Sequence, residues 1–159
     1  MIIHGAAWIF GDDVDTDQII PTQYLTLPTI REMAKFTMEP QDPYFATKYQ
    51  SGGILIGGKN FGCGSSREQA PAVLKELGVR IIIAKSFARI FFRNCINLGI
   101  LLIEIPQLDF VETGTDVMID TDSSHVQIGK QVYPFVPLSD FLRKIIEKGG
   151  LVNYLRETA

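Results

Sequence analysis

The chain has 159 residues, 46% of them apolar and 21% charged, which is typical of a soluble globular protein with one sizeable core. A formal net charge of −3 argues against a non-specific nucleic-acid or membrane surface. No apolar run approaches the roughly 18 residues of a membrane span. Two cysteines and a start without a signal-peptide pattern predict free thiols and a cytoplasmic location.

The N-terminal part begins with a strand and a long connection. Residues 2–10 are rich in Ile, Trp and Phe and predict a strand. The acidic stretch 11–18 imitates the start of an EF-hand, but Gln18 and Tyr24 stand where that loop takes Gly and Glu, so calcium is excluded. A solvated acidic turn is the simpler interpretation. Prolines bracket the loop at 21–28, and a short helix is expected just after it, from Thr29 to Phe36.

Residues 53–105 read as strand, helix, strand, helix, strand. We expect the first helix to run to Leu77 and the second, capped by Ser86, to cover residues 87–98. An apolar stripe on the second helix predicts core positions: Phe87, Ile90, Phe91 and Cys95. This pattern indicates parallel strands joined by crossover helices.

The C-terminal part predicts a β-hairpin or meander at residues 115–120 and 125–135. A helix capped by Ser139 and a short tail helix at 151–156 should follow. The predicted fold class is α/β, a compact β/β/α domain over residues 1–159 with a mainly parallel βαβαβ core and an added antiparallel hairpin.

The turn at residues 62–68 (GCGSSRE) carries the chemistry. Its glycines, Gly62 and Gly64, allow a tight turn with positive φ and a close approach of a ligand to the backbone. Ser65 and Glu68 have capping-box spacing, which predicts that a helix begins here with unpaired N–H groups. Together with Ser66 and Arg67, these N–H groups form a possible anion-binding site.

Several familiar sites are excluded at this turn. The turn lacks the Gly-Lys-Ser/Thr ending of a P-loop. A dinucleotide-binding fingerprint would need glycine in place of Arg67, and a nucleophile elbow would need serine in place of Gly64. His4 and His125 lie in predicted strands, so we interpret them as packing or surface residues and not as a catalytic base. Three alternatives stay open from the residues alone: anion binding, catalysis by a serine whose alkoxide is stabilised by amides and Arg67, and a structural turn.

Three motifs in order, at residues 13–20, 60–70 and 83–90, resemble the aconitase superfamily, in particular the swivelling domain that forms the small subunit of 3-isopropylmalate dehydratase. The resemblance implies dehydration and rehydration through an enoic acid, in leucine biosynthesis. It implies Ser65 as the alkoxide base, Arg67 as the carboxylate partner, Ser66 as a hydrogen-bond donor and Asp17 as an active-site aspartate.

The resemblance also implies a partner and a substrate class. The [4Fe–4S] cluster would belong to a large subunit, in a heterodimer or heterotetramer, so this chain alone should be inactive. Substrate choice is associated with the loop after the acidic stretch, where relatives that act on a further carboxylate place an arginine. Here the loop is Tyr24, Leu25, Thr26 and Leu27, which suits an alkyl group such as isopropyl.

Other functions remain as alternatives. One alternative to isopropylmalate is a related substrate, such as 2,3-dimethylmalate, homoaconitate or a citraconate-type acid, and Arg31 lies near enough in sequence to reach an extra carboxylate. A non-catalytic anion-binding module is a second possibility. RNA binding, known in some aconitase relatives, is disfavoured by the acidic balance and the lack of a basic stripe.

Overall fold

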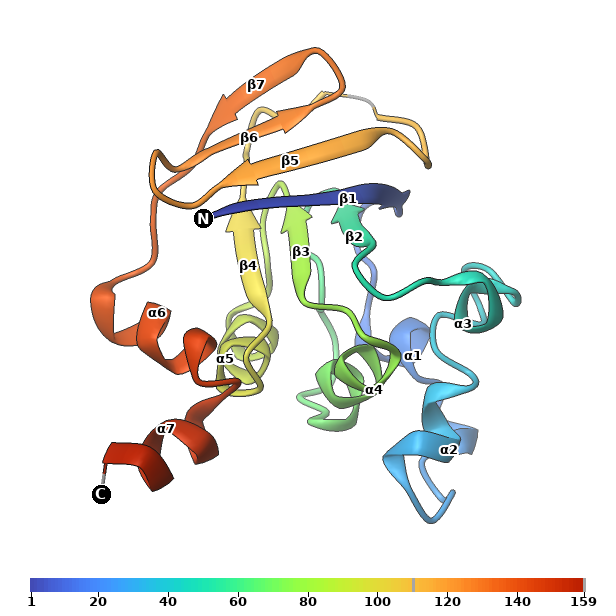
Figure 1. Cartoon of the computed structure of the whole chain (residues 1–159). Coiled ribbons are helices and arrows are strands. Elements are labelled where there is room, and N and C mark those ends of the chain that lie inside the picture. Colours follow the sequence, from blue (N-terminus) through green and yellow to red (C-terminus); the bar gives the residue numbers. More distant parts are fainter. Residues whose placement is uncertain (110, 159) are drawn as a thin grey trace.

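The computed structural model describes residues 1–109 and 111–158. An antiparallel strand layer, a parallel strand layer and a helical layer are stacked in this order from top to bottom of Figure 1. The strands form one hydrogen-bonded sheet in the order β4-β3-β2-β1-β5-β6-β7. The strands are β1 (Ile2–Ile9), β2 (Ile54–Gly57), β3 (Ile81–Ala84), β4 (Leu101–Glu104), β5 (Asp116–Asp120), β6 (His125–Ile128) and β7 (Gln131–Pro134).

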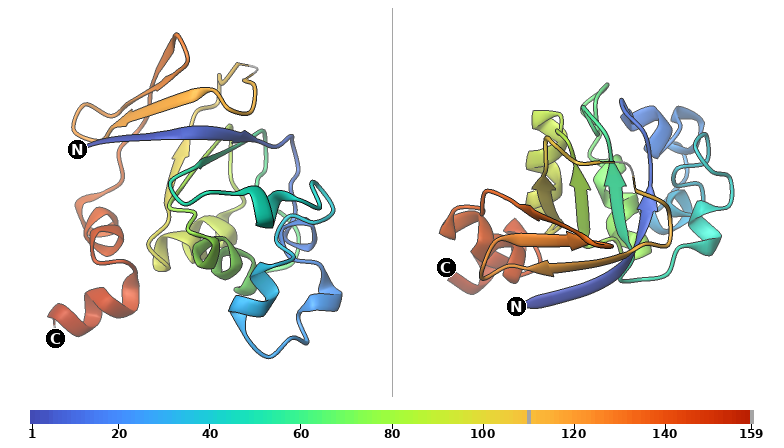
Figure 2. Two further views of the ribbon diagram at one scale, coloured as in Figure 1. Left: turned by 45° about the vertical axis from the view of Figure 1, so that its right-hand side comes forward. Right: turned by 90° about the horizontal axis from the view of Figure 1, so that it is seen from above.

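Strand β1 belongs to both strand layers. Its first part pairs antiparallel with β5, from Ile2 to Ala6, and its last part pairs parallel with β2, from Ala7 to Ile9. The two layers therefore cross where β1 passes from one to the other, as the view from above shows (Figure 2). β2, β3 and β4 pair parallel in sequence, which confirms the predicted βαβαβ core.

Each face of the parallel layer is covered by a separate apolar core. In β2, Ile54 and Ile56 point to the antiparallel layer, whereas Leu55 points to the helices. β3 alternates in the same way, because successive side chains of a strand point to opposite faces. Both faces of the parallel layer are thus buried, which explains why its strands have continuous apolar sequences.

The helices lie mainly on one side of the parallel layer. They are α1 (Thr16–Ile19), α2 (Ile30–Ala34), α3 (Phe45–Lys48), α4 (Gln69–Leu77), α5 (Arg89–Asn97), α6 (Asp140–Glu147) and α7 (Leu151–Thr158), with a 3₁₀ helix η1 at Thr22–Tyr24. The predicted helix after Thr29 is confirmed, and Thr29 caps it by accepting from the N–H of Glu32. The end of the acidic stretch, expected as a turn, forms most of the one-turn helix α1.

Two predicted helix starts were wrong. α4 begins at Gln69 with Glu68 as its N-cap and no side-chain capping bond, so Ser65 is not a cap. α5 begins at Arg89, and the predicted cap, Ser86, instead accepts a hydrogen bond from the N–H of Asn60 at 2.8 Å. In both places a contact with a distant loop holds the predicted cap residue outside the helix: Ser65 O accepts from the Thr16 hydroxyl, and Ser86 accepts from Asn60.

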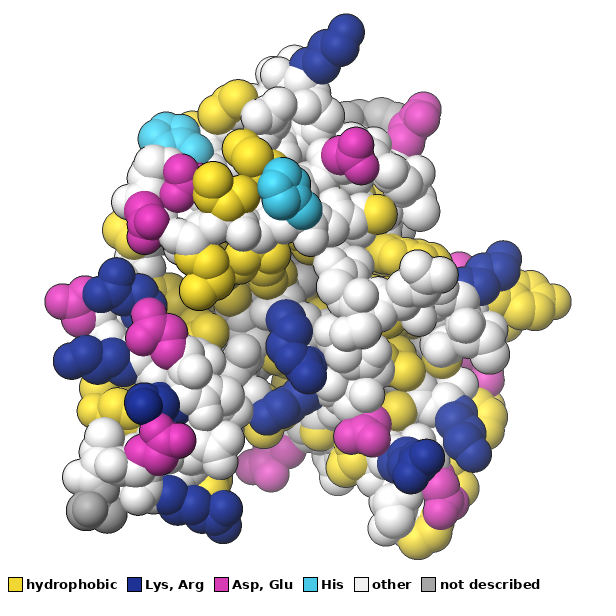
Figure 3. Space-filling view, in the orientation of Figure 1, with side chains coloured by type: hydrophobic (Ala, Val, Ile, Leu, Met, Phe, Trp, Pro, Cys, Tyr) yellow, Lys and Arg dark blue, Asp and Glu magenta, His cyan; other side chains and the backbone are white. Residues whose placement is uncertain are grey.

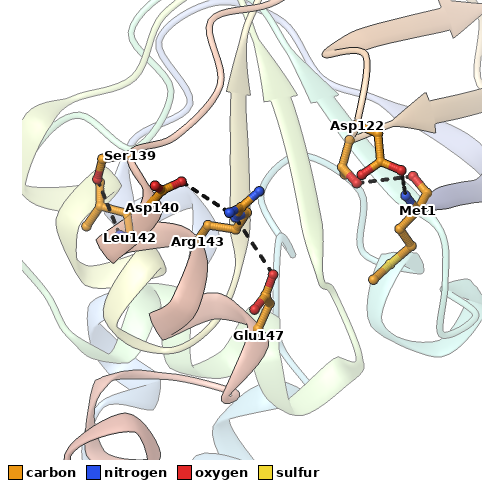
Figure 4. Close-up of polar contacts among 8 residues, drawn as sticks. Met1, Asp122, Ser139, Asp140, Leu142, Arg143 and Glu147 are labelled. Carbon is orange, nitrogen blue, oxygen red and sulfur yellow. Dashed lines mark hydrogen bonds and ion pairs between the residues drawn. The ribbon is translucent and has the colours of Figure 1, made fainter.

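The C-terminal part is a three-stranded meander, β5 to β7, rather than a single hairpin, followed by two helices. Ser139 caps α6 as predicted, accepting from the N–H of Leu142, and Arg143 contacts the carboxylates of Asp140 and Glu147 (Figure 4). The terminal amine of Met1 pairs with Asp122, 2.8 Å away, and ties the chain start to the β5–β6 turn.

The surface agrees with the near-neutral charge. In Figure 3, acidic and basic side chains are interspersed over the visible face, and both histidines lie on the surface of the antiparallel layer. No helix within residues 1–109 and 111–158 has the length and apolar character needed to cross a bilayer.

Candidate active site

Three loops meet at the carboxyl ends of β1, β2 and β3. Backbone hydrogen bonds connect them: Gly58 N–H donates to Gly11 O at 3.0 Å, and Lys85 N–H donates to Gly58 O at 3.0 Å. Phe61 then forms a bridge with Phe87. The carboxyl edge of parallel strands is where open α/β sheets bind ligands, and here this edge holds the serine turn.

The acidic loop is fastened to the serine turn, so it is not simply a solvated turn. Gly62 N–H donates to Val14 O at 2.7 Å, and Thr16 N–H donates to Cys63 O at 2.9 Å. The Thr16 hydroxyl donates to Ser65 O at 2.8 Å. Asp15 caps α1 in a full capping box. The loop after β1 thus forms one wall of the site.

Ser65 and Ser66 are both exposed. Gly62 and Gly64 adopt φ of 84° and 93°, as predicted, and a Cβ at Gly62 would lie 2.1 Å from the Phe91 ring. Among the residues that the structure describes, no acceptor is hydrogen-bonded to the backbone N–H of Gly64, Ser65 or Ser66. These amides are available to an anion or an alkoxide.

A cavity of about 210 Å³ opens in front of the serines. The turn forms one wall, and the first two turns of α5 form the other, including Arg89, Ile90 and Asn94. The positive end of a helix dipole therefore faces the site, but it is that of α5 and not of the helix that follows the serines. Ile90, predicted as core, is 53% exposed because it borders this cavity.

Sequence reasoning missed the contribution of α5. The resemblance reached residues 83–90, yet the side chains of Arg89 and Asn94 were not among the predicted site residues. A useful signal was present in the sequence: a helix that follows a buried parallel strand begins at the carboxyl edge of the sheet, so its first turn joins whatever site lies there.

Arg67 and Asp17 are brought together. Arg67 Nη1 lies 2.6 Å from Asp17 Oδ1. The guanidinium also donates to Ile20 O at 3.3 Å and to Thr22 Oγ1 at 3.2 Å. Only 17% of the Arg67 side chain is exposed, against 58% for Asp17. An ion pair open on the Asp17 side adds little stability, so its effect is to fix the guanidinium of Arg67, a residue that borders the same cavity as the serines.

The two thiols differ in setting. Cys63 is half-buried in the serine turn, and burial, followed by the charges of Asp15 and Asp13, raises its pKa. Burial raises the pKa of Cys95 strongly in the core. A protonated thiol is a poor nucleophile and a poor metal ligand. Residues 1–109 and 111–158 contain no group of three or more His, Cys, Asp or Glu placed to hold a metal ion.

The predicted specificity loop is anchored beside the site. The Tyr24 ring stacks on Phe36 with centroids 3.9 Å apart, and its hydroxyl donates to Glu39 at 2.6 Å. Leu25 and Leu27 pack on the helical core. None of residues 24–27 borders the serine cavity itself; the loop reaches the site through the contact of Arg67 with Thr22.

Comparisons with known proteins agree with this geometry. The aconitase C-terminal domain family matches residues 29–108. The 3-isopropylmalate dehydratase small subunit of Methanosarcina acetivorans is 48% identical over 98% of this chain and 97% of its own length. That of Lachnospira eligens is 49% identical over 96% and 93%. The crystal structure of 3-isopropylmalate dehydratase from Methanocaldococcus jannaschii superposes with a TM-score of 0.93 at 44% identity, covering 99% of this chain and 95% of that one. The chain therefore belongs to the family of 3-isopropylmalate dehydratase small subunits.

Proposed function

We propose that this chain is the small subunit of a two-chain hydro-lyase that interconverts 2-isopropylmalate and 3-isopropylmalate in leucine biosynthesis. We further propose that residues 1–159 form one swivelling domain, active only with its large subunit. The observation that carries the proposal is an exposed Ser65 on an amide-lined cavity beside Arg67, in a chain nearly half identical to named small subunits.

Ser65 acts as the base in this proposal. Free amides of the turn, the positive end of α5 and the Arg67 guanidinium all favour the alkoxide over the hydroxyl. The alkoxide takes the proton from the carbon next to a substrate carboxylate, and the electron pair of the broken C–H bond forms the double bond. Hydroxide leaves the adjacent carbon, and addition of water in the opposite sense gives the isomer.

Arg67, Ser66 and the amide of Gly64 bind the substrate carboxylate in the same proposal. Asp17 orients Arg67, because its carboxylate lies 2.6 Å from the guanidinium. A carboxylate taken out of water needs such charged and hydrogen-bonding partners, or its burial is costly.

The cofactor belongs to the partner in this proposal. An iron–sulfur cluster takes three or four thiolates, and the two thiols here, one in the turn and one buried in the core, do not fit that requirement. On the large subunit, the [4Fe–4S] cluster would supply a Lewis acid for the departing hydroxyl. The exposed mouth of the serine cavity is the surface that must face it.

Substitution of Ser65 tests the proposal. The purified chain is mixed with the cluster-loaded large subunit of the same organism, and turnover of both isopropylmalate isomers is measured. Ser65→Ala should lower kcat by about 10²–10⁴-fold, the usual contribution of a positioned base, while the two subunits still co-purify. Neither subunit alone should turn over substrate.

Ser123→Ala is the matched control, because Ser123 is an exposed serine in the turn between β5 and β6; its complex should behave as wild type. Substantial turnover by the Ser65→Ala complex would remove Ser65 as the base. A wild-type complex inactive on isopropylmalate but active on 2,3-dimethylmalate or homoaconitate would keep the chemistry and change the substrate.

A further inference from the structure

Thr16 and Thr37 are the buried polar side chains of the described core, at 2% and 1% exposure. A buried hydroxyl without a partner is unfavourable, and each has found one. Thr37 donates to Ala34 O at 2.7 Å, three residues earlier in the chain. Thr16 donates to Ser65 O at 2.8 Å, 49 residues away. One bond is local, whereas the other joins the acidic loop to the serine turn.

Further contacts between α1 and the serine turn show that the Thr16 bond restricts the backbone at Ser65. Thr16 also donates its N–H to Cys63 O at 2.9 Å, so two donors of one residue hold both sides of Gly64. A Cβ at Gly64 would lie 3.3 Å from Asp15 Cβ and 3.4 Å from Thr16 Oγ1. The turn therefore lies directly against α1, and Thr16 itself borders the serine cavity.

We propose that Thr16 is a positioning residue: its hydroxyl, together with the Arg67 N–H that donates to the same carbonyl at 2.8 Å, fixes the peptide group that follows Ser65 and thereby the direction of the Ser65 side chain. The inference rests on the proposed function, in which Ser65 is the base. Rotation of that peptide group would change ψ of Ser65 and move the hydroxyl relative to the substrate carbon. A displacement of about 1 Å in a reacting group is enough to reduce a rate about 10²-fold.

Substitution of Thr16 in the reconstituted two-subunit enzyme tests this role. Thr16→Val keeps the shape and removes the donor, and should lower kcat by about 10²-fold with KM little changed. Thr16→Ser restores the hydroxyl and should recover most of the turnover. Thr37→Val is the matched control: it removes a hydroxyl equally buried and equally bonded, and should cost stability without slowing the folded enzyme.

An isotope effect separates misplacement of the base from loss of folded protein. Substrate deuterated at the carbon that loses its proton is compared with ordinary substrate. If Ser65 is misplaced, proton removal becomes slower relative to the other steps, and the isotope effect on kcat should rise in Thr16→Val. A smaller folded fraction lowers both rates equally and leaves the isotope effect unchanged, which is the result expected for Thr37→Val.

An unchanged kcat and isotope effect in Thr16→Val would overturn the inference. If that variant fails to fold, Thr16→Ala carries the same prediction, since it removes the hydroxyl without placing a methyl group against the Ser65 carbonyl. Ser65→Ala is assayed in parallel. An active Ser65→Ala refutes the proposed function itself, whereas an inactive Ser65→Ala beside a fully active Thr16→Val refutes only the role of Thr16.

Discussion

Tyr49 is a buried tyrosine whose ionisation links stability to alkaline pH. Its hydroxyl donates to Gly53 O at 2.6 Å, and its side chain packs between Trp8 and Phe45. Burial raises the pKa of Tyr49 to about 12, partly offset by the charge of Arg80. In the unfolded chain a tyrosine has a pKa of about 10. The folded state therefore holds this proton over a pH range in which the unfolded state loses it.

The sign of the effect follows from this difference. The contribution is fully present below about pH 10 and is lost as the pH rises toward about 12, because unfolding then releases the proton. Tyr49→Phe cannot ionise, so its free energy of unfolding should fall less steeply in this window. At neutral pH it should be less stable by about 0.5–1.5 kcal/mol through the lost hydrogen bond.

Urea unfolding across the alkaline range measures both effects. Tyr44→Phe is the control, since Tyr44 is 62% exposed, and its curve should follow wild type. If Tyr49→Phe and wild type lose stability in parallel above pH 10, the buried phenol is not the group responsible.

At the scale of elements, the loop at residues 22–27 connects the site to α2. Its fixed points are Thr22, which accepts from Arg67, and Tyr24, which stacks on Phe36. Thr26 follows them, is exposed and makes only a local bond, to Gln23 O at 3.4 Å. A larger side chain at position 26 therefore fits without disturbing the loop.

Thr26→Arg should shift the preference of the complex toward substrates with a further carboxylate. A charge-assisted hydrogen bond contributes about 1.5–3 kcal/mol, so the ratio of kcat/KM for homoaconitate over isopropylmalate should rise about ten- to hundredfold. Thr47→Arg is the control, because Thr47 is also exposed and also bonds locally, to Tyr44 O. An unchanged ratio in Thr26→Arg would contradict the assignment of this loop to specificity.

The elements that could be predicted from sequence are those whose signals are local. The buried strands β2, β3 and β4 follow from short apolar runs rich in branched residues, and α6 from the Ser139 cap. The starts of α4 and α5 could not be predicted, because tertiary contacts override local capping. The Ser65 carbonyl is held by Thr16, and Phe87 is held in a bridge with Phe61.

The same distinction holds for the site. The Gly62–Glu68 turn and its serines could be proposed from the sequence, because glycine, serine and arginine in that spacing have a direct chemical meaning. The bond from Thr16 to Ser65 spans 49 residues, and the α5 wall of the cavity depends on how two crossover units pack. The Thr16 bond leaves no pattern within a short stretch of sequence, so only the fold shows it, whereas the order of strand and helix that brings α5 to this edge can be recognised in the sequence.

At the scale of the whole molecule, β1 makes the two strand layers interdependent. It pairs with β5 in one layer and β2 in the other, and the loop that leaves it forms a wall of the site. Gly5 lies near the crossing, where a Cβ would stand 2.3 Å from Gly52 O. Only a glycine allows this approach. The layers should therefore unfold together as one cooperative unit.

Gly5→Ala should shift unfolding of both layers to the same extent. A clash with backbone in a packed region costs about 1–3 kcal/mol, and because β1 is shared, neither layer can keep its stability alone. Trp8, the only tryptophan, lies against Phe45 with ring centroids 5.4 Å apart and reports the helical core by fluorescence. Hydrogen exchange of β6 amides reports the antiparallel layer.

Both probes should move to lower denaturant concentration by equal amounts. Gly11→Ala is the control, because a Cβ there meets nothing within 4 Å and should leave both transitions in place. A Gly5→Ala variant in which the antiparallel layer loses protection while the Trp8 transition stays unchanged would show two independent units. In that case the serine cavity, whose acidic wall follows β1, would adjoin a part of the chain that unfolds independently of the helical core.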